Sequence, residues 1–456
     1  MRSIANRRDA LRALRTALAT TLTAGALSAC SGGIFGMFDS SKNKKKLPGT
    51  RISVLALERE LRPNIEAADT AIVLPRPADT ESWPEAGGFS HHAMHHVVIG
   101  ANPKVVWRQN IGQSSGKRNR NLAEPIVANG RVYTVNAKGE VDAFDAATGK
   151  RAWRVKSAPK KDDDGAFLGG GVAYEDGKVF VTGGYAQVVA LDANTGAQLW
   201  RTPVDTPIHS APTVNGGRVF AVTVENQVVA LAASTGKKLW TYSGASTPTI
   251  LLGGAAPAVD GGVVVAAFTS GELAALRVDT GTPLWNETVV AVRRTEAAAS
   301  LPDVAGRPVI DKGRVYAVGH SGILVAIDLR TGQRVWDAPV AGVYGPWIAG
   351  DFLYAVTLDS ELVGIDVRSG RILWVTQLQR FKNEDSKKGR IVWAGPGLAS
   401  DRLIVVGSHE QALAVSPYSG EVLSRMKLAS PATLPPVFAK STMYLLNDKG
   451  DLAAYR

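Results

Sequence analysis

An eleven-residue string recurs through most of the chain and constrains its fold more than any other feature. The first copy reads Ala-Phe-Asp-Ala-Ala-Thr-Gly-Lys-Arg-Ala-Trp over residues 143–153. Six copies end in tryptophans that lie 38 to 51 residues apart, at Trp153, Trp200, Trp240, Trp285, Trp336 and Trp374. A seventh, degenerate copy over residues 414–424 ends in Ser424. This period is typical of one four-stranded blade of a β-propeller.

The chemistry of the string predicts a strand, a tight turn and a second strand. An aspartate such as Asp145 can accept hydrogen bonds from free backbone N–H groups of the turn, and the glycine tolerates a positive φ. The tryptophan that ends the second strand is large enough to fill the gap between neighbouring blades. Upstream of each copy, Asn-Gly or Asp-Gly steps between apolar runs predict a hairpin, as in residues 125–135.

Counting these units predicts eight blades. They begin near Ala123, Leu168, Ser210, Ala255, Arg307, Pro346, Gly395 and Leu434. The last unit has no fourth strand after it, but residues 103–112, with Trp107, resemble one. We therefore predict an all-β fold, an eight-bladed β-propeller of four-stranded antiparallel blades, closed by an N-terminal strand that pairs with the C-terminal blade. The Gly-His and Trp-Asp signatures of WD40 propellers do not recur from blade to blade.

The N-terminus is typical of a bacterial export signal. A basic stretch up to Arg15 precedes an apolar stretch that is too short to span a bilayer, and Leu27-Ser28-Ala29-Cys30 resembles a lipobox, in which the cysteine is acylated. Cys30 is the only cysteine of the chain, and acylation would consume its thiol. We expect a signal peptide over residues 1–29, a lipidated Cys30 with a tether to residue 50, an N-terminal extension over residues 51–102 and the propeller over residues 103–456.

The net charge of +11 falls to +7 when residues 1–29, with five arginines and one aspartate, are removed. This balance suits solubility or contact with anionic lipid, and no nucleic-acid-binding module is recognisable, so no nucleic-acid partner is expected. The lysines of residues 42–46 either touch lipid headgroups or belong to a solvated spacer.

Other candidate sites have simpler interpretations. His91, His92, His95 and His96 have a spacing that would suit a metal on a helix, but the run has no acidic or cysteine partner, and a loop of solvated histidines over a propeller face is favoured. Gly169-Gly170-Gly171 lacks the Gly-Lys-Ser/Thr ending of a phosphate loop. Most acidic residues stand at turn positions. We expect no metal, no cofactor and no catalytic residue.

The Asp-x-x-Thr-Gly-x-x-x-Trp string resembles the repeat of quinoprotein-like (PQQ-like) propellers over residues 104–456. With the lipobox, the tether and eight blades, the whole chain is similar to the BamB family, lipoproteins of the outer-membrane β-barrel assembly machinery. The extension over residues 51–102, with a candidate helix near residues 54–61, departs from that family's shorter N-terminus. The alternative is a quinone-dependent dehydrogenase, which needs a cofactor cradle with adjacent cysteines and a bound cation near the ring axis.

The resemblance implies a lipid-anchored, non-catalytic scaffold of the outer membrane that faces the periplasm. Its implied partners are the POTRA domains of a BamA-like barrel subunit and unfolded outer-membrane protein clients. The family's docking loops correspond to two strings, one with the apolar triplet Ile250, Leu251 and Leu252 and the next with Asp303. Leu251 and Asp303 match the family pattern, whereas Thr249, Leu252 and Ala305 replace a leucine, an arginine and an aspartate. Exposed apolar loops mark interaction sites; the alternative is that this triplet tucks under its blade.

Overall fold

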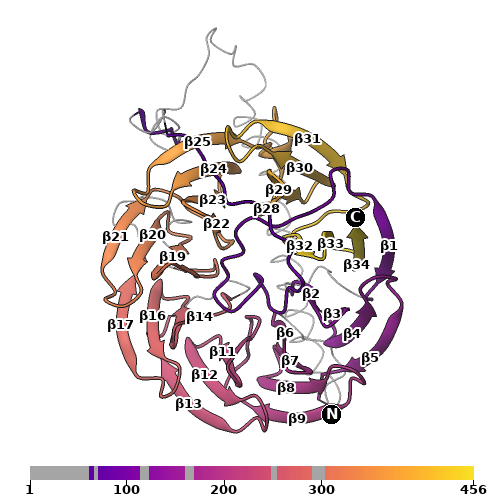
Figure 1. Ribbon diagram of the computed structural model, residues 1–456. Helices are drawn as coiled ribbons and strands as arrows, with labels where there is room; N and C mark the ends of the chain where they lie inside the picture. Colours follow the sequence, from indigo (N-terminus) through magenta and orange to yellow (C-terminus); the bar gives the residue numbers. More distant parts are fainter. Residues whose placement is uncertain (1–60, 66–69, 113–122, 160–168, 248–253, 290–302) are drawn as a thin grey trace, which may run out of the picture. The chain divides into compact units, whose positions relative to one another are not determined.

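The computed structural model describes residues 61–65, 70–112, 123–159, 169–247, 254–289 and 303–456. The calls on Cys30, on the candidate helix at residues 54–61 and on Ile250, Leu251 and Leu252 lie outside these residues. Within residues 61–456, eight four-stranded antiparallel sheets surround a central axis (Figure 1). The prediction of an all-β, eight-bladed propeller is therefore confirmed. The described residues contain no helix that could cross a membrane.

Each blade runs from an innermost first strand to an outermost fourth strand. Blades 1 to 4 comprise β2 (Ile126–Ala128), β3 (Arg131–Val135), β4 (Glu140–Asp145) and β5 (Arg151–Lys156); β6 (Gly171–Glu175), β7 (Lys178–Gly183), β8 (Gln187–Asp192) and β9 (Gln198–Pro203); β10 (Thr213–Asn215), β11 (Arg218–Val222), β12 (Gln227–Ala232) and β13 (Lys238–Ser243); and β14 (Ala258–Asp260), β15 (Val263–Ala267), β16 (Glu272–Arg277) and β17 (Pro283–Thr288).

Blades 5 to 8 continue in the same order. They comprise β18 (Val309–Asp311), β19 (Arg314–Val318), β20 (Leu324–Asp328) and β21 (Arg334–Ala338); β22 (Trp347–Ala349), β23 (Phe352–Val356), β24 (Glu361–Asp366) and β25 (Ile372–Gln377); β28 (Trp393–Ala399), β29 (Arg402–Gly407), β30 (Gln411–Val415) and β31 (Val422–Lys427); and β32 (Val437–Ala439), β33 (Thr442–Leu446), β34 (Asp451–Tyr455) and β1 (Val105–Asn110). An exposed hairpin of β26 (Phe381–Asn383) and β27 (Lys388–Arg390) follows blade 6.

The ring closes between the two ends of the chain, as predicted. β1 pairs antiparallel with β34, with Trp107 opposite Ala454 and Asn110 opposite Asp451. Blade 8 thus takes three strands from the C-terminus and its fourth from residues 105–110. This pairing gives the last blade the same four strands as the other seven.

The repeated turn has the geometry that its chemistry predicts. In blade 1, Asp145 Oδ1 accepts hydrogen bonds from the Thr148 backbone N–H at 2.8 Å and from Thr148 Oγ1 at 2.7 Å. Gly149 has a φ of 73°, and an added Cβ would lie 2.6 Å from the Trp107 ring of the preceding blade. The glycine is therefore required both by the turn and by the close approach of the tryptophan.

The strand order gives the ring two different faces. The turn face carries the Asp-Thr-Gly turns between third and fourth strands and the short turns between first and second strands. The connection face carries the chain segments that lead from each fourth strand into the next blade, together with the turns between second and third strands. On this face the chain connects β13 to β14 and β17 to β18, and Gly254 and Asp303 are described residues of these two connections.

Candidate functional site

Residues 78–99 of the extension, which we call the plug, lie across the centre of the ring (Figure 1). Each innermost strand has one edge facing the channel, and its backbone N–H and C=O groups need partners there. The plug supplies partners to all eight blades. The hydrogen bonds, from blade 1 to blade 8, are Trp83 N to Val127 O, Tyr174 N to Pro84 O, Val214 N to Glu85 Oε1, Val259 N to Ser90 O, Ile310 N to His91 O, Trp347 Nε1 to His95 O, Ser400 N to Val97 O and Lys440 N to Thr80 O.

Aromatic packing fixes the plug between blades 6 and 8. Trp83 is 2% exposed, and its ring stacks on Trp347 with centroids 6.1 Å apart. Phe438 meets the Trp83 ring edge-on at 5.9 Å. Because the plug bonds residues of the innermost strands and of the turns that follow them, it fills the channel at the level of these strands.

An ion pair crosses the channel beside the plug. Arg307, at the entry of blade 5, donates to Glu124 Oε1, at the entry of blade 1, over 2.6 Å. The Gly87 N–H of the plug donates to the other oxygen of Glu124 at 3.2 Å. Blades 1 and 5 are opposite each other in a ring of eight, so this pair and the plug together bridge its full width.

Glu85 is the most deeply buried carboxyl of the plug. It is 3% exposed, and burial raises its pKa well above the usual carboxyl range. The hydrogen bond that it accepts from the Val214 N–H lowers the pKa and so opposes part of this shift. A carboxyl with a raised pKa in the folded state confers stability that is complete below the unfolded pKa, about 4.3, and is lost as the pH rises toward the folded pKa. The plug should therefore be held less tightly in alkaline solution.

The histidine run is not the solvated loop that the sequence favoured; that interpretation is wrong for His92 and His96. Both are buried, and each ring Nδ1 lies 2.8 Å from a backbone oxygen, that of Pro308 or of Pro75. Burial, helped by nearby Arg307, lowers the pKa of His92 to about 3, so its ring is neutral at physiological pH. Among the described residues, no group of histidine, cysteine or acidic side chains is arranged to hold a metal ion.

On the connection face, the bases of the two expected docking loops meet at one small pocket. It has a volume of about 20 Å³, room for one water molecule, and its lining includes His209, Asn226, Gly254 and Asp303. Gly254 is the first described residue after the Ile250–Leu252 string, and Asp303 belongs to the second string, over residues 301–308. Asp303 is buried within the protein itself, and its backbone oxygen accepts a hydrogen bond from the His320 N–H at 2.9 Å.

Asn226, which the sequence reasoning did not single out, anchors the first of these loops. Its Nδ2 donates to Ala245 O at 2.6 Å, and its Oδ1 accepts from Thr269 N and Oγ1 at 3.1 and 2.9 Å. Asn226 has a φ of 60°, a conformation that asparagine adopts more readily than most residues. An asparagine in the turn between second and third strands is the only signal that the sequence offered.

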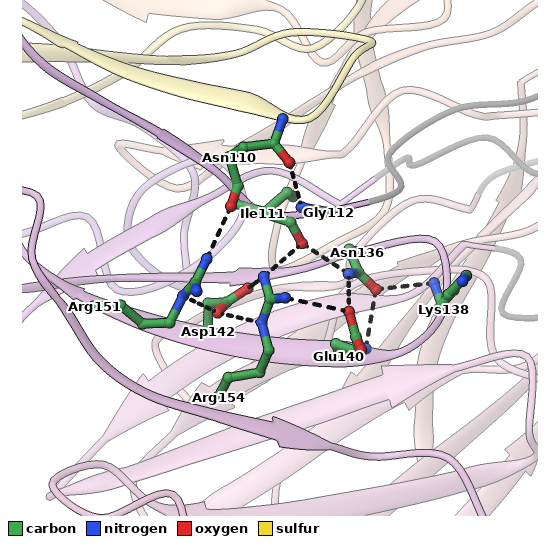
Figure 2. Close-up of polar contacts among 9 residues, drawn as sticks. All are labelled: Asn110, Ile111, Gly112, Asn136, Lys138, Glu140, Asp142, Arg151 and Arg154. Atoms are coloured by element: carbon green, nitrogen blue, oxygen red, sulfur yellow. Dashed lines mark hydrogen bonds and ion pairs between the residues drawn. The ribbon is translucent and has the colours of Figure 1, made fainter.

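A second unforeseen cluster locks the closing strand onto blade 1 (Figure 2). Asp142, fully buried on β4, accepts two hydrogen bonds from Arg154 at 2.7 and 2.8 Å and pairs with Arg151 at 2.8 Å. The arginines also donate to the backbone oxygens of Asn110 and Ile111, at the end of β1. Burial raises the pKa of Asp142, and the bond to Asp142 raises the pKa of Arg154. The cluster spans the boundary between blades 8 and 1 and serves ring closure.

The described residues do not fit a quinone cofactor. The sequence has one cysteine, so the adjacent cysteine pair of such a cradle is absent. Along the axis, the channel is filled by Trp83, His92 and the Glu124–Arg307 pair, and the remaining space beside them is about 30 Å³.

Comparison with known proteins gives one consistent family. A family model described as outer membrane protein assembly factor BamB matches residues 96–164 and 137–377. The BamB proteins of Salmonella typhimurium and Escherichia coli are 30% and 31% identical to the chain; each match covers 56% of this chain and 65% of the relative. The chain thus spans slightly less than two thirds of these relatives' length.

Solved structures agree on the fold. BamB from Moraxella catarrhalis superposes with a TM-score of 0.63 at 19% identity, covering 78% of this chain and 98% of that one. A quinohemoprotein alcohol dehydrogenase from Comamonas testosteroni superposes with a TM-score of 0.64 at 14% identity, covering 83% and 81%. At these identities the likeness shows the propeller fold alone.

Proposed function

We propose, on the premise that this chain belongs to the family of outer membrane protein assembly factor BamB, that it is a non-catalytic scaffold of β-barrel assembly. In this proposal Cys30 carries a lipid anchor in the outer membrane, and the propeller faces the periplasm. The connection face contacts the POTRA domains of a BamA-like barrel subunit and thereby assists the folding and insertion of unfolded outer-membrane clients.

The observation that carries this proposal is the pocket at blades 3 to 5. There Gly254, the first described residue after the Ile250–Leu252 string, and Asp303 of the second string line one cavity, which supports the proposal that the two strings dock together. Asn226 fixes the approach to the first loop. Loops held on a rigid sheet are a common way to present a binding surface.

Burial of Asp303 changes the role expected of it. A buried carboxylate would support binding by holding the chain before β18 in place and not by touching the partner directly. Reversing its charge would disturb the fold. Leu251 is therefore the better residue for a binding test, because binding energy concentrates in a few apolar or aromatic contacts.

The test is co-purification from the native membrane in mild detergent. Wild-type protein should bring down a barrel protein with POTRA domains, and Leu251→Arg should lose it. Leu239→Arg is the matched control, because Leu239 is an exposed leucine on β13 of the same blade; it should retain the partner. Melting temperatures are measured in parallel. Retention of the partner by a stable Leu251→Arg protein would place the docking surface elsewhere, and a large drop in melting temperature would mean that Leu251 belongs to the core.

A further inference from the structure

Seven of the eight boundaries between blades are filled in the same way. The tryptophan of the fourth strand lies against the turn between the third and fourth strands of the next blade, and its indole N–H donates to a backbone oxygen in that turn. The donors and acceptors are Trp107 and Ala146, Trp153 and Ala193, Trp200 and Ala233, Trp240 and Val278, Trp285 and Leu329, Trp336 and Val367, and Trp374 and Pro417.

At two of these boundaries the same backbone oxygen also accepts a hydrogen bond from an arginine side chain. Ala193 O accepts from the Trp153 indole at 3.0 Å and from Arg131, the first residue of β3, at 2.7 Å. Val367 O likewise accepts from Trp336 at 2.7 Å and from Arg314, the first residue of β19, at 3.2 Å. A carbonyl oxygen has two lone pairs, so one guanidinium and one indole can share it.

The boundary between blades 7 and 8 has an arginine at the start of the second strand, as these two boundaries do, but it has no tryptophan on the fourth strand. Arg402, the first residue of β29, donates to Ala101 O at 2.6 Å, so residue 101 stands where the other blades place the turn carbonyl. Ser424 occupies the position of the missing tryptophan: it pairs with Ala414 in blade 7 just as Trp374 pairs with Gly364 in blade 6. Ser424 is exposed and too short to reach across the boundary.

The missing tryptophan leaves an apolar cavity of about 330 Å³. Its lining includes Ala101, Ile404, Ala414, Ser424, Met426 and Met443. Ile404 replaces the aromatic residue that packs on the tryptophan in most blades, such as Tyr354 on Trp374. A cavity of 150 Å³ accepts benzene, so this one has room for a bicyclic ring, and it falls within the usual range of ligand pockets.

We propose that this cavity, which we call the seam site, binds the tryptophan side chain of another polypeptide. The incoming indole occupies the place that Trp374 and its counterparts fill at the other boundaries. Its ring packs between Met426 of blade 7 and Met443 of blade 8, and its N–H donates to Ala101 O beside Arg402. The site lies apart from the connection face, and the proposal does not depend on the assembly function.

Methionine methyl groups provide the readout. The chain has five methionines; Met426 and Met443 line the seam site, whereas Met94 lies in the plug. In protein labelled with [methyl-¹³C]methionine, N-acetyltryptophanamide should shift the Met426 and Met443 resonances in a saturable way, through the ring current of the indole, and leave Met94 in place. Absence of a shift, or an equal shift of Met94, overturns the proposal.

Matched ligands test separately the indole N–H, the aromatic ring and the polypeptide source that the proposal requires. N-acetyl-1-methyltryptophanamide, which has no indole N–H, should bind at least fivefold more weakly, and N-acetylleucinamide should give no saturable shift. Equal binding of the leucine compound would make the cavity a general apolar site and overturn the aromatic assignment. Binding of free indole with exclusion of N-acetyltryptophanamide would assign the cavity to a small molecule and overturn the polypeptide source.

Two substitutions complete the test. Ser424→Trp should fill the site from within, abolish the ligand-induced shifts and raise the melting temperature, while Ser386→Trp on the exposed hairpin between blades 6 and 7 should leave binding unchanged. Met426→Gln makes the wall polar without adding bulk and should weaken binding at least fivefold, as reported by Met443. Undiminished binding in Met426→Gln overturns the proposal even if Ser424→Trp fails to fold.

Discussion

Replacing Trp83 with alanine tests whether the plug is an integral part of the folded ring. Trp83 is 2% exposed and lies between the rings of Trp347 and Phe438. A buried tryptophan removes roughly 200 Å² from water, which corresponds to about 5 kcal/mol at 25 cal/mol per Å². Measured truncations of this kind cost about 3–5 kcal/mol, so we expect the free energy of unfolding to fall by that amount.

The assay is equilibrium unfolding in urea, followed by circular dichroism and by fluorescence. Val73→Ala is the control, because Val73 is 75% exposed on the same extension and its truncation should change stability by less than about 0.5 kcal/mol. A loss below about 1 kcal/mol for Trp83→Ala, with coincident transitions, would show that the ring folds independently of the plug. The backbone bonds between residue 83 and Val127 would then be incidental contacts.

Three further outcomes are expected. Cys30→Ala should move the protein from the membrane fraction to the soluble fraction, because the acyl anchor is lost; retention after a high-salt wash would contradict lipidation. Glu85→Gln should raise the melting temperature above that of the wild type, and the increase should be larger at pH 8 than at pH 5. The reason is that the amide oxygen can accept the Val214 hydrogen bond while the side chain stays uncharged at both pH values. An increase that does not change with pH would show that Glu85 does not titrate as its burial implies. The purified protein should not reduce a redox dye when pyrroloquinoline quinone and Ca²⁺ are added, because the cysteine pair is absent and the axis is filled. Dye reduction that requires both additions would contradict the conclusion that the chain does not hold this cofactor.

The sequence predicted the blades because their determinants are local. Asp145, Thr148 and Gly149 form their turn with hydrogen bonds that span only a few residues, and the tryptophan follows at a fixed distance. Repetition of one such unit, together with the unpaired strand at residues 103–112, was enough to specify the number of blades and the closure. Contacts of this kind leave a recognisable pattern in the residues themselves.

The plug could not be predicted in the same way, because most of its bonds to the blades use backbone N–H and C=O groups. Pro84, Ser90 and Val97 each bond a different blade through the carbonyl, and any residue provides that group. For the same reason the histidine run was misread: nothing in its spacing indicates that His92 and His96 are enclosed by the ring.

The Asp142 cluster and the seam site did leave signals in the sequence. Asp142 stands where the other blades place an apolar residue, such as Val189 or Val229, and Ser424 stands where they place tryptophan. Each is a departure from the repeat at a position whose neighbours are known from the other blades. Such departures mark places where one copy of a repeat has been altered, and they can be found once the repeat is aligned.

The two boundaries of blade 8 are built differently, and the difference bears on how the ring tolerates a cavity. Toward blade 1, the boundary has Trp107 and the buried bonds of Asp142 with two arginines. Toward blade 7, it has Ser424 and a cavity. A blade made from both chain ends would be the weakest part of a ring held only by contacts between neighbours. Here the plug also bonds blades 7 and 8 directly, through Val97 and Thr80, so closure does not depend on the filling of that boundary. Because the ring is held from its centre, one boundary can remain open to a ligand.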